Sequence, residues 1–174
     1  MTVPGSIKNV VREPDARYLV QPPVIGTLVD SCILIDVLAD DPQWADWSIE
    51  QLDRCARLAP LFINPLILAE VSPRFERAVD LEMALAALPL VREALPWDAA
   101  FLAGQAFRVY RQSSGSRTSP MPDFYIGAHA LVGGLQLLTR DVARYRSYFP
   151  KLAMVTPESA RMLPTQHCNS LSFK

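Results

Sequence analysis

The sequence predicts an α/β protein with a mostly parallel sheet that is covered by helices on both faces. Two observations support this fold class. Short apolar runs alternate along the chain with segments whose apolar residues have helical spacing. The connections between the apolar runs are too long for β-hairpins, as parallel strands require. The chain has 174 residues, 50% of them hydrophobic, which suits a single domain with a sizeable core.

The first expected strand covers residues 24–29 (VIGTLV), a short apolar run rich in β-branched residues. A helix is expected from Ser31 to Ala39, where the Ser31 hydroxyl can cap the first turn. The sequence DDP then ends this helix, and residues 44–58 form a second amphipathic segment. The domain therefore begins with a strand and two helices.

A second short strand is expected at residues 61–64, and Pro65 opens the helix that follows it at 65–75. The rest of the chain continues the alternation, apart from a flexible connection at 113–121 that is rich in Ser, Gly and Pro. The remaining elements are helices at 77–88 and 98–112 with a weak strand at 91–96 between them, a helix at 122–134, a strand at 135–139, a short helix at 141–149 and a last strand at 152–156.

The formal net charge of −1 hides an uneven distribution of charges along the chain. Residues 1–103 contain 8 Lys and Arg against 15 Asp and Glu, whereas residues 104–151 contain 7 against 2. A basic stretch of this kind indicates a polyanionic substrate, although a solvated helix face explains any single arginine equally well. The basic residues of this stretch are Arg108, Arg111, Arg117, Arg140, Arg144, Arg146 and Lys151.

Four carboxylates lie at the ends of apolar runs or on the helices beside them. Ligands of parallel sheets bind beyond the carboxyl ends of the strands, so acids far apart in the sequence can meet there. Helix capping explains one such acid, but it does not explain four at the same edge. Adjacent carboxylates repel one another, and a hard cation such as Mg²⁺ or Mn²⁺ removes this conflict. The four candidates are Asp30, Glu70, Asp123 and Asp141.

Three further side chains are candidates for supporting roles. Ser31 and Thr139 carry hydroxyls next to two of the carboxylates and can orient a carboxylate or a phosphate, although capping and local backbone hydrogen bonds explain them equally well. Arg117 precedes Asp123 in the flexible connection and is a candidate for binding a substrate phosphate. Asp36 either reaches the site from the first helix or faces solvent.

Several other classes of protein are disfavoured. No His/Cys cluster with zinc spacing, no phosphate-binding glycine loop and no GxSxG turn is present. The first carboxylate stands in D-S-C rather than D-x-D, which disfavours an aspartyl-phosphate phosphatase. The three cysteines lack a disulfide pattern and fit a reducing compartment. Without a segment resembling a signal peptide or a membrane span, we expect a cytoplasmic protein that does not interact with a membrane.

Four segments resemble, in order and spacing, the motifs of the PIN-domain family, and within it the VapC-type ribonuclease toxins. They are VDSCILID, NPLILAEV, MPDFYIGAHAL and LLTRDVARYRSYFP. Four motifs in order are far more specific than any one of them. The resemblance covers residues 24–157, so that residues 1–23 are expected to be an N-terminal extension and residues 158–174 a C-terminal tail.

The resemblance implies a three-layer α/β/α sandwich in which Mg²⁺ or Mn²⁺ is held by Asp30, Glu70, Asp123 and Asp141. It also implies metal-dependent cleavage of RNA, a homodimer, and inhibition by a small cognate antitoxin protein. Two alternatives remain open at this point. One is a non-catalytic PIN module that binds RNA or a protein partner, and the other is a structure-specific DNA nuclease with similar chemistry.

Overall fold

The computed structural model describes residues 25–113 and 115–160, in which strands and helices alternate as expected. The elements of the first half are β1 (Thr27–Val29), α1 (Ser31–Leu38), α2 (Ala45–Leu58), β2 (Leu61–Ile63), α3 (Pro65–Val71), a 3₁₀ turn (Ser72–Arg74), α4 (Ala78–Ala86) and β3 (Leu90–Arg92). Those of the second half are α5 (Trp97–Gln112), α6 (Pro122–Val132), β4 (Gln136–Leu138), α7 (Val142–Tyr148), β5 (Met154–Val155) and α8 (Pro157–Ala160).

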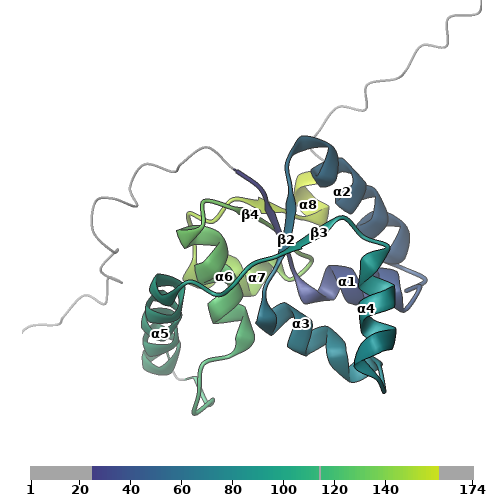
Figure 1. Ribbon diagram of the computed structural model, residues 1–174. Coiled ribbons are helices and arrows are strands. Elements are labelled where there is room, and N and C mark those ends of the chain that lie inside the picture. Colours follow the sequence, from purple (N-terminus) through teal and green to yellow (C-terminus); the bar gives the residue numbers. More distant parts are fainter. Residues whose placement is uncertain (1–24, 114, 161–174) are drawn as a thin grey trace, which may run out of the picture.

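The strands form one sheet in the order β3-β2-β1-β4-β5, and every neighbouring pair is parallel. Helices α5, α6 and α7 lie on one side of this sheet, and α1, α2 and α4 lie on the other (Figure 1). The predicted three-layer α/β/α sandwich is therefore confirmed.

The strand order places a topological switch point between β1 and β4. The chain moves outward from β1 through β2 to β3, crosses the sheet, and continues outward on the other side from β4 to β5. Ligands of open α/β sheets bind in the crevice at such a point, beyond the carboxyl ends of the strands. Asp30 follows β1 directly, and Asp141 lies shortly after β4. Both acids are therefore at the expected position for a ligand site.

Two local features differ from the sequence expectation. The helix expected at 65–75 ends at Val71 and continues as a 3₁₀ turn, because Pro73 cannot donate the next helical hydrogen bond. Residues 158–160, assigned to the tail, form α8 together with Pro157. The expected extension at 1–23 and the remainder of the tail from residue 161 lie outside the described residues.

The core lies between the sheet and its two helical layers. The central strand β1 is fully buried, as are Leu137 and Leu138 on the neighbouring β4. Strands buried on both faces read as continuous apolar runs, which explains why both strands were recognisable in the sequence. In the described part of the chain, none of the helices has the length and apolar character needed to cross a bilayer.

Replacing Gly127 by Ala is expected to destabilise the fold by about 1–3 kcal/mol, because the space beside this glycine is filled. A Cβ atom at Gly127 on α6 would lie 2.5 Å from the buried ring of Phe149. Chemical unfolding measures the effect. Gly104→Ala is the matched control, since a Cβ at this position on α5 meets nothing within 4 Å. The control should gain about 0.5–1 kcal/mol from helix propensity, and equal losses in both variants would contradict the account.

Candidate active site

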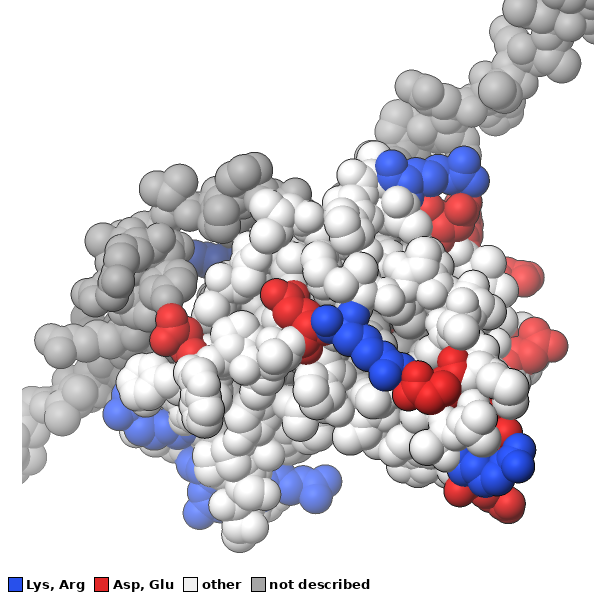
Figure 2. Space-filling model, in the orientation of Figure 1, with Lys and Arg blue, Asp and Glu red and all other residues white. Residues whose placement is uncertain are grey.

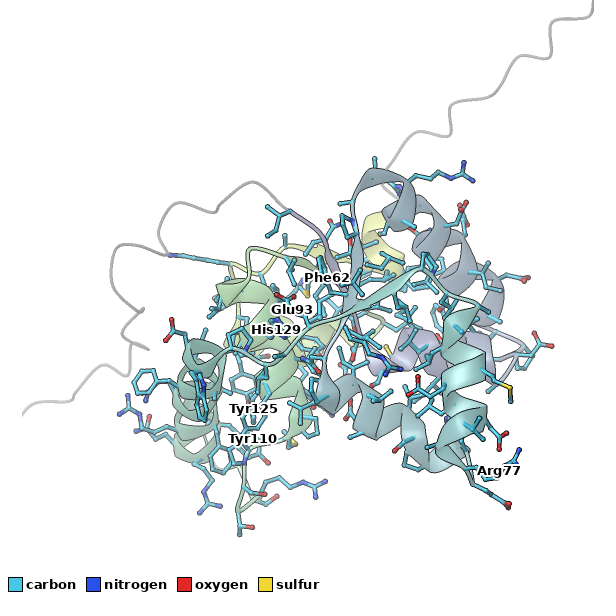
Figure 3. The ribbon with its side chains drawn as sticks, in the orientation of Figure 1. Phe62, Arg77, Glu93, Tyr110, Tyr125 and His129 are labelled. Carbon is cyan, nitrogen blue, oxygen red and sulfur yellow. The ribbon has the colours of Figure 1, made fainter. Side chains whose placement is uncertain are left out.

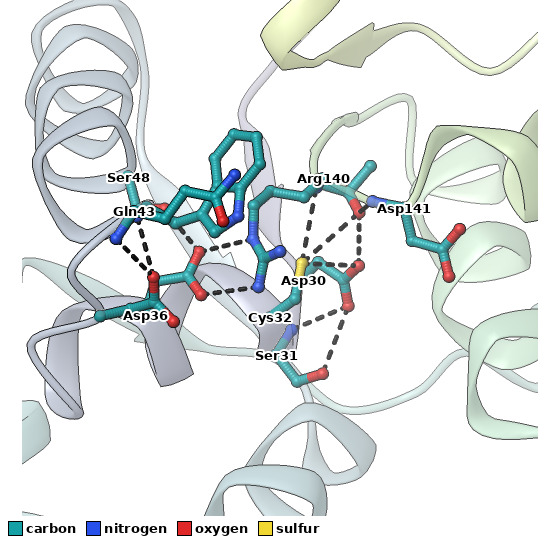
Figure 4. Close-up of polar contacts among 11 residues, drawn as sticks. Asp30, Ser31, Cys32, Asp36, Gln43, Ser48, Arg140 and Asp141 are labelled. Atoms are coloured by element: carbon teal, nitrogen blue, oxygen red, sulfur yellow. Dashed lines mark hydrogen bonds and ion pairs between the residues drawn. The ribbon is translucent and has the colours of Figure 1, made fainter.

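Asp30 is a buried carboxylate at the end of the central strand, and its side chain is only 4% exposed. The backbone N–H of Ser31 donates to Asp30 Oδ1 at 2.8 Å, so Asp30 caps α1. The hydroxyls of Thr139 and Tyr145 donate to Asp30 Oδ2 at 2.6 and 3.3 Å (Figure 4 shows the surroundings of Asp30). Burial raises the pKa of Asp30, and the nearby charge of Asp123 adds to this effect. Asp30 has no cationic partner among the described residues.

Glu70 lies on α3 and is joined to Asp30 by a single hydroxyl. Ser31 Oγ donates to Glu70 Oε2 at 2.8 Å and lies 3.5 Å from Asp30 Oδ1. Burial raises the pKa of Glu70, and the charges of Asp30 and Asp123 raise it further. Ser31 thus connects two of the predicted carboxylates and is placed to orient Glu70.

Asp123 and Asp141 are brought together by an arginine. Arg144 on α7 donates a hydrogen bond from Nη1 to Asp123 Oδ2, and the same nitrogen lies 3.7 Å from Asp141 Oδ2. Asp123 lies in the first turn of α6, and Asp141 precedes α7. The backbone N–H of Asp141 also donates to Thr139 Oγ1 at 3.0 Å, so Thr139 connects Asp141 to Asp30.

The four predicted carboxylates therefore occupy one neighbourhood, although their oxygen atoms do not surround a common point. In residues 25–113 and 115–160, no group of three or more acidic, His or Cys side chains is placed to hold a metal ion. The residues present nevertheless fit a hard cation. Oxygen donors are the ligands that Mg²⁺ prefers, and the buried Asp30 charge is repelled by its acidic neighbours without a countercharge of its own.

Cys32 is a half-buried group beside Asp30. Its thiol lies 3.5 Å from Asp30 Oδ2 and 3.7 Å from Thr139 Oγ1. Burial, followed by the charge of Asp30, raises the pKa of Cys32 to about 12. The thiol therefore stays protonated at neutral pH and is not a thiolate nucleophile.

Asp36 neither reaches the site nor faces solvent, so both sequence expectations for it are wrong. Its side chain is 1% exposed and accepts two hydrogen bonds of 2.7 Å from Arg140 and one of 2.8 Å from the Ser48 hydroxyl (Figure 4). The Arg140 guanidinium also lies 5.0 Å from the ring of Trp44. Because Arg140 stands between Thr139 and Asp141, this ion pair anchors the loop that carries both candidate residues.

The basic stretch has two kinds of arginine. Arg140, Arg144 and Arg146 form ion pairs with Asp36, Asp123 and Glu158, respectively. Arg108, Arg111 and Arg117 form no ion pair within the described residues, and their side chains are exposed. Arg117 contacts its neighbours through its backbone: its N–H donates to the Tyr110 hydroxyl at 3.4 Å, and its carbonyl accepts from Arg111 at 2.6 Å.

His129 is a fully buried histidine on α6. Its Nδ1 lies 3.1 Å from Asn64 Nδ2, and its Nε2 lies 3.5 Å from a Glu93 oxygen; Figure 3 shows His129 beside Glu93. Burial lowers the pKa of His129, with an opposing effect from Glu93. His129 therefore links α6 to the residues that directly follow β2 and β3.

Sequence reasoning missed two residues of this site. Arg144 was assigned to the basic stretch, but its spacing of three residues from Asp141 on a helix predicts that the two side chains meet. Tyr145 is almost inaccessible, and burial together with the surrounding acids raises its pKa well above the usual value. Its hydroxyl therefore remains a hydrogen-bond donor to Asp30.

Comparison with known families identifies a match to the PIN domain over residues 27–148. Three solved structures with the same fold are VapBC2 from Rickettsia felis bound to promoter DNA (16% identity, TM-score 0.60, 75% of this chain and 97% of that one), DNA-bound VapBC from Salmonella typhimurium (18%, 0.57, 76% and 98%) and FitAcB from Neisseria gonorrhoeae (20%, 0.54, 76% and 98%). At these identities the likeness establishes the fold. A sequence comparison with curated proteins gave no match.

Proposed function

The chain belongs to the PIN-domain family, and from this premise we propose that it is a metal-dependent endoribonuclease that acts as the toxin of a toxin–antitoxin pair. The observation that carries the proposal is the position of Asp30. A buried carboxylate at the switch point of the sheet has two acidic neighbours from other segments, Asp123 and Glu70, and no cationic partner within the described residues. Such an arrangement costs stability unless a cation binds there.

The proposed ligands of the Mg²⁺ or Mn²⁺ ion are Asp30, Glu70, Asp123 and Asp141. When bound, the ion would supply positive charge for the phosphate oxygens and lower the pKa of a water molecule. The protein's own contribution is to hold the carboxylates. The Ser31 hydroxyl orients Glu70, and Thr139 fixes both Asp30 and the backbone of Asp141. These hydrogen bonds keep the acids in place against their mutual repulsion.

The proposed substrate is RNA, and its phosphates suit the unpaired arginines of the basic stretch. Basic side chains gather over α5 and the loop that follows it, at the lower left of the molecule (Figure 2). Arg117 is the proposed phosphate contact in this region, since its exposed side chain lies in the segment that leads to Asp123. Phosphate contacts position a nucleic acid without reading its sequence.

The proposed partners are a second copy of this chain and a small cognate antitoxin, in the cytoplasm. The VapBC and FitAB structures with the same fold are complexes. DNA is bound in VapBC2 from Rickettsia felis, in FitAB and in VapBC from Salmonella typhimurium. The proposal transfers the two-component arrangement to this protein through the family resemblance. Its nuclease site does not depend on that transfer, because the four carboxylates belong to one chain.

Purified protein is expected to cleave single-stranded RNA when Mg²⁺ or Mn²⁺ is present and to stop when EDTA removes the ion. Gel analysis of a labelled RNA measures the products, and DNA of the same sequence is the matched substrate. Cleavage of the DNA alone would favour a structure-specific DNA nuclease. RNA binding without cleavage, unchanged by EDTA, would favour the non-catalytic binding module and would overturn the proposal.

A further inference from the structure

We propose that Arg144 is an internal counter-ion of the candidate metal centre, which the metal ion displaces from Asp123 and which then binds a phosphate of the RNA. This inference rests on the proposed function. It assigns a role to Arg144, which is not one of the four proposed metal ligands. Arg144 thereby connects the occupancy of the metal site to the binding of the substrate.

The first observation is that Arg144 forms the only ion pairs of the four candidate carboxylates within the described residues. Its Nη1 donates to Asp123 and lies 3.7 Å from Asp141 Oδ2. The charge of Arg144 also acts on Glu70, whose pKa it lowers against the stronger effect of burial. One guanidinium thus lies between two of the acids, Asp123 and Asp141, which come from different segments.

A metal ion bound to Asp123 would compete with Arg144 for the same carboxylate. A divalent cation such as Mg²⁺ binds carboxylate oxygens at about 2.0–2.1 Å, and its positive charge repels a guanidinium on the same carboxylate. Binding of the ion to Asp123 therefore weakens the contact of Asp123 with Arg144. By thermodynamic reciprocity, the guanidinium weakens the binding of the ion to the same extent.

The structure also has space beside Arg144 for a displaced guanidinium. A groove of about 360 Å³ lies beside the carboxylates, between α5, the start of α6, and α7. The Arg144 side chain is 45% exposed and lines this groove, so it can turn without leaving a buried position. The other lining residues include Tyr110, Met121, Asp141 and Tyr148.

Two of the arginines without an ion pair in the described residues lie next to Tyr110, which lines the groove. Tyr110, which Figure 3 shows on α5, accepts a hydrogen bond from the backbone of Arg117. Arg111 follows Tyr110 and donates to the carbonyl of Arg117. A polyanion that passes over the groove therefore meets Arg117 and Arg111 at one end and Arg144 beside the carboxylates at the other. This charge pattern fits an RNA backbone.

A purely structural role for Arg144 predicts the opposite behaviour toward metal. If the guanidinium only held Asp123 in the correct orientation, its removal would disorder a ligand and weaken metal binding. If it competes with the ion, its removal strengthens metal binding. The sign of the change in metal affinity separates the two roles without reference to catalysis.

Electron paramagnetic resonance of free Mn²⁺ measures the metal affinity of the full chain. We expect Arg144→Gln to bind Mn²⁺ about five- to tenfold more tightly than the wild type at low ionic strength. Arg144→Lys, which keeps the charge, should stay within about twofold of the wild type. The matched control is Arg146→Gln, an exposed arginine two residues further along α7 that pairs with Glu158, and it should change nothing.

The second readout is the affinity for a single-stranded phosphorothioate RNA in the presence of Mn²⁺. Arg144→Gln is expected to bind this RNA about tenfold more weakly, whereas Arg146→Gln should bind as the wild type does. Weaker or unchanged Mn²⁺ binding by Arg144→Gln would overturn the inference while leaving the proposed nuclease intact. A wild-type chain that neither binds Mn²⁺ nor cleaves RNA would overturn the proposed function, and this inference with it.

Discussion

The Asp30→Asn variant is expected to lose RNA cleavage by at least about 10²-fold and, in the absence of metal, to be more stable than the wild type. Both effects follow from one buried charge. The amide keeps the shape of the side chain, and its oxygen can still accept from the Ser31 N–H, while its NH2 group can donate to the Thr139 hydroxyl in place of the hydrogen bond that Asp30 accepts. It removes the negative charge that the ion requires and that the folded protein otherwise holds without compensation.

Single-turnover cleavage of a labelled RNA measures the first effect, and chemical unfolding in EDTA measures the second. The gain in stability is expected to be about 1 kcal/mol at neutral pH. Because burial raises the pKa of Asp30 in the folded protein, the wild type recovers stability as the pH falls through that raised value. The difference between the two proteins should therefore shrink in acid. Full cleavage activity in the variant would remove Asp30 from the site.

The Arg140→Gln variant is expected to lose about 3 kcal/mol of stability, because the change leaves the buried charge of Asp36 without its partner. Asp36 would keep only the hydrogen bond from Ser48. The loop that carries Thr139 and Asp141 would lose its anchor as well, so RNA cleavage should fall even where the variant is folded. Urea unfolding at neutral pH measures the loss.

The control for this prediction is Arg57→Gln, which removes an exposed ion pair with Asp53 on α2. Exposed pairs contribute little, so this variant should unfold as the wild type does. Combining Arg140→Gln with Asp36→Asn should restore part of the lost stability, because the unpaired charge is then removed as well. Equal stability of Arg140→Gln and the wild type would show that the pair does not anchor the loop.

The sequence was sufficient to predict the strands that build the site. β1 is fully buried and β4 largely so, and both therefore lie in short, mostly apolar runs, each with an acid near its end. Parallel topology then predicts that Asp30 and Asp141 meet at one edge of the sheet, and the structure bears this out. The expectation that the Ser31 hydroxyl caps α1 was wrong, because Asp30 is the N-cap, and the contact of Ser31 with Glu70 depends on how α3 is placed against α1.

The pairing of the arginines could not be predicted from the sequence in the same way. Asp36 and Arg140 are separated by more than 100 residues, and only the packing of the β4–α7 loop against α1 brings them together. Without this information, Arg140 was indistinguishable from Arg117, which has no ion pair within the described residues. Charge composition reports the number of basic residues but not which of them are already neutralised inside the fold.

The central claim is that the carboxylates at the switch point hold a divalent cation, and Mn²⁺ binding to the purified chain tests it most directly. The wild type is expected to bind Mn²⁺, and Asp123→Asn is expected to bind it at least about 10-fold more weakly. Asp53→Asn, which changes an exposed acid on α2, should retain the affinity of the wild type. Equal Mn²⁺ affinities of the wild type and Asp123→Asn, or no binding by the wild type, would contradict the claim.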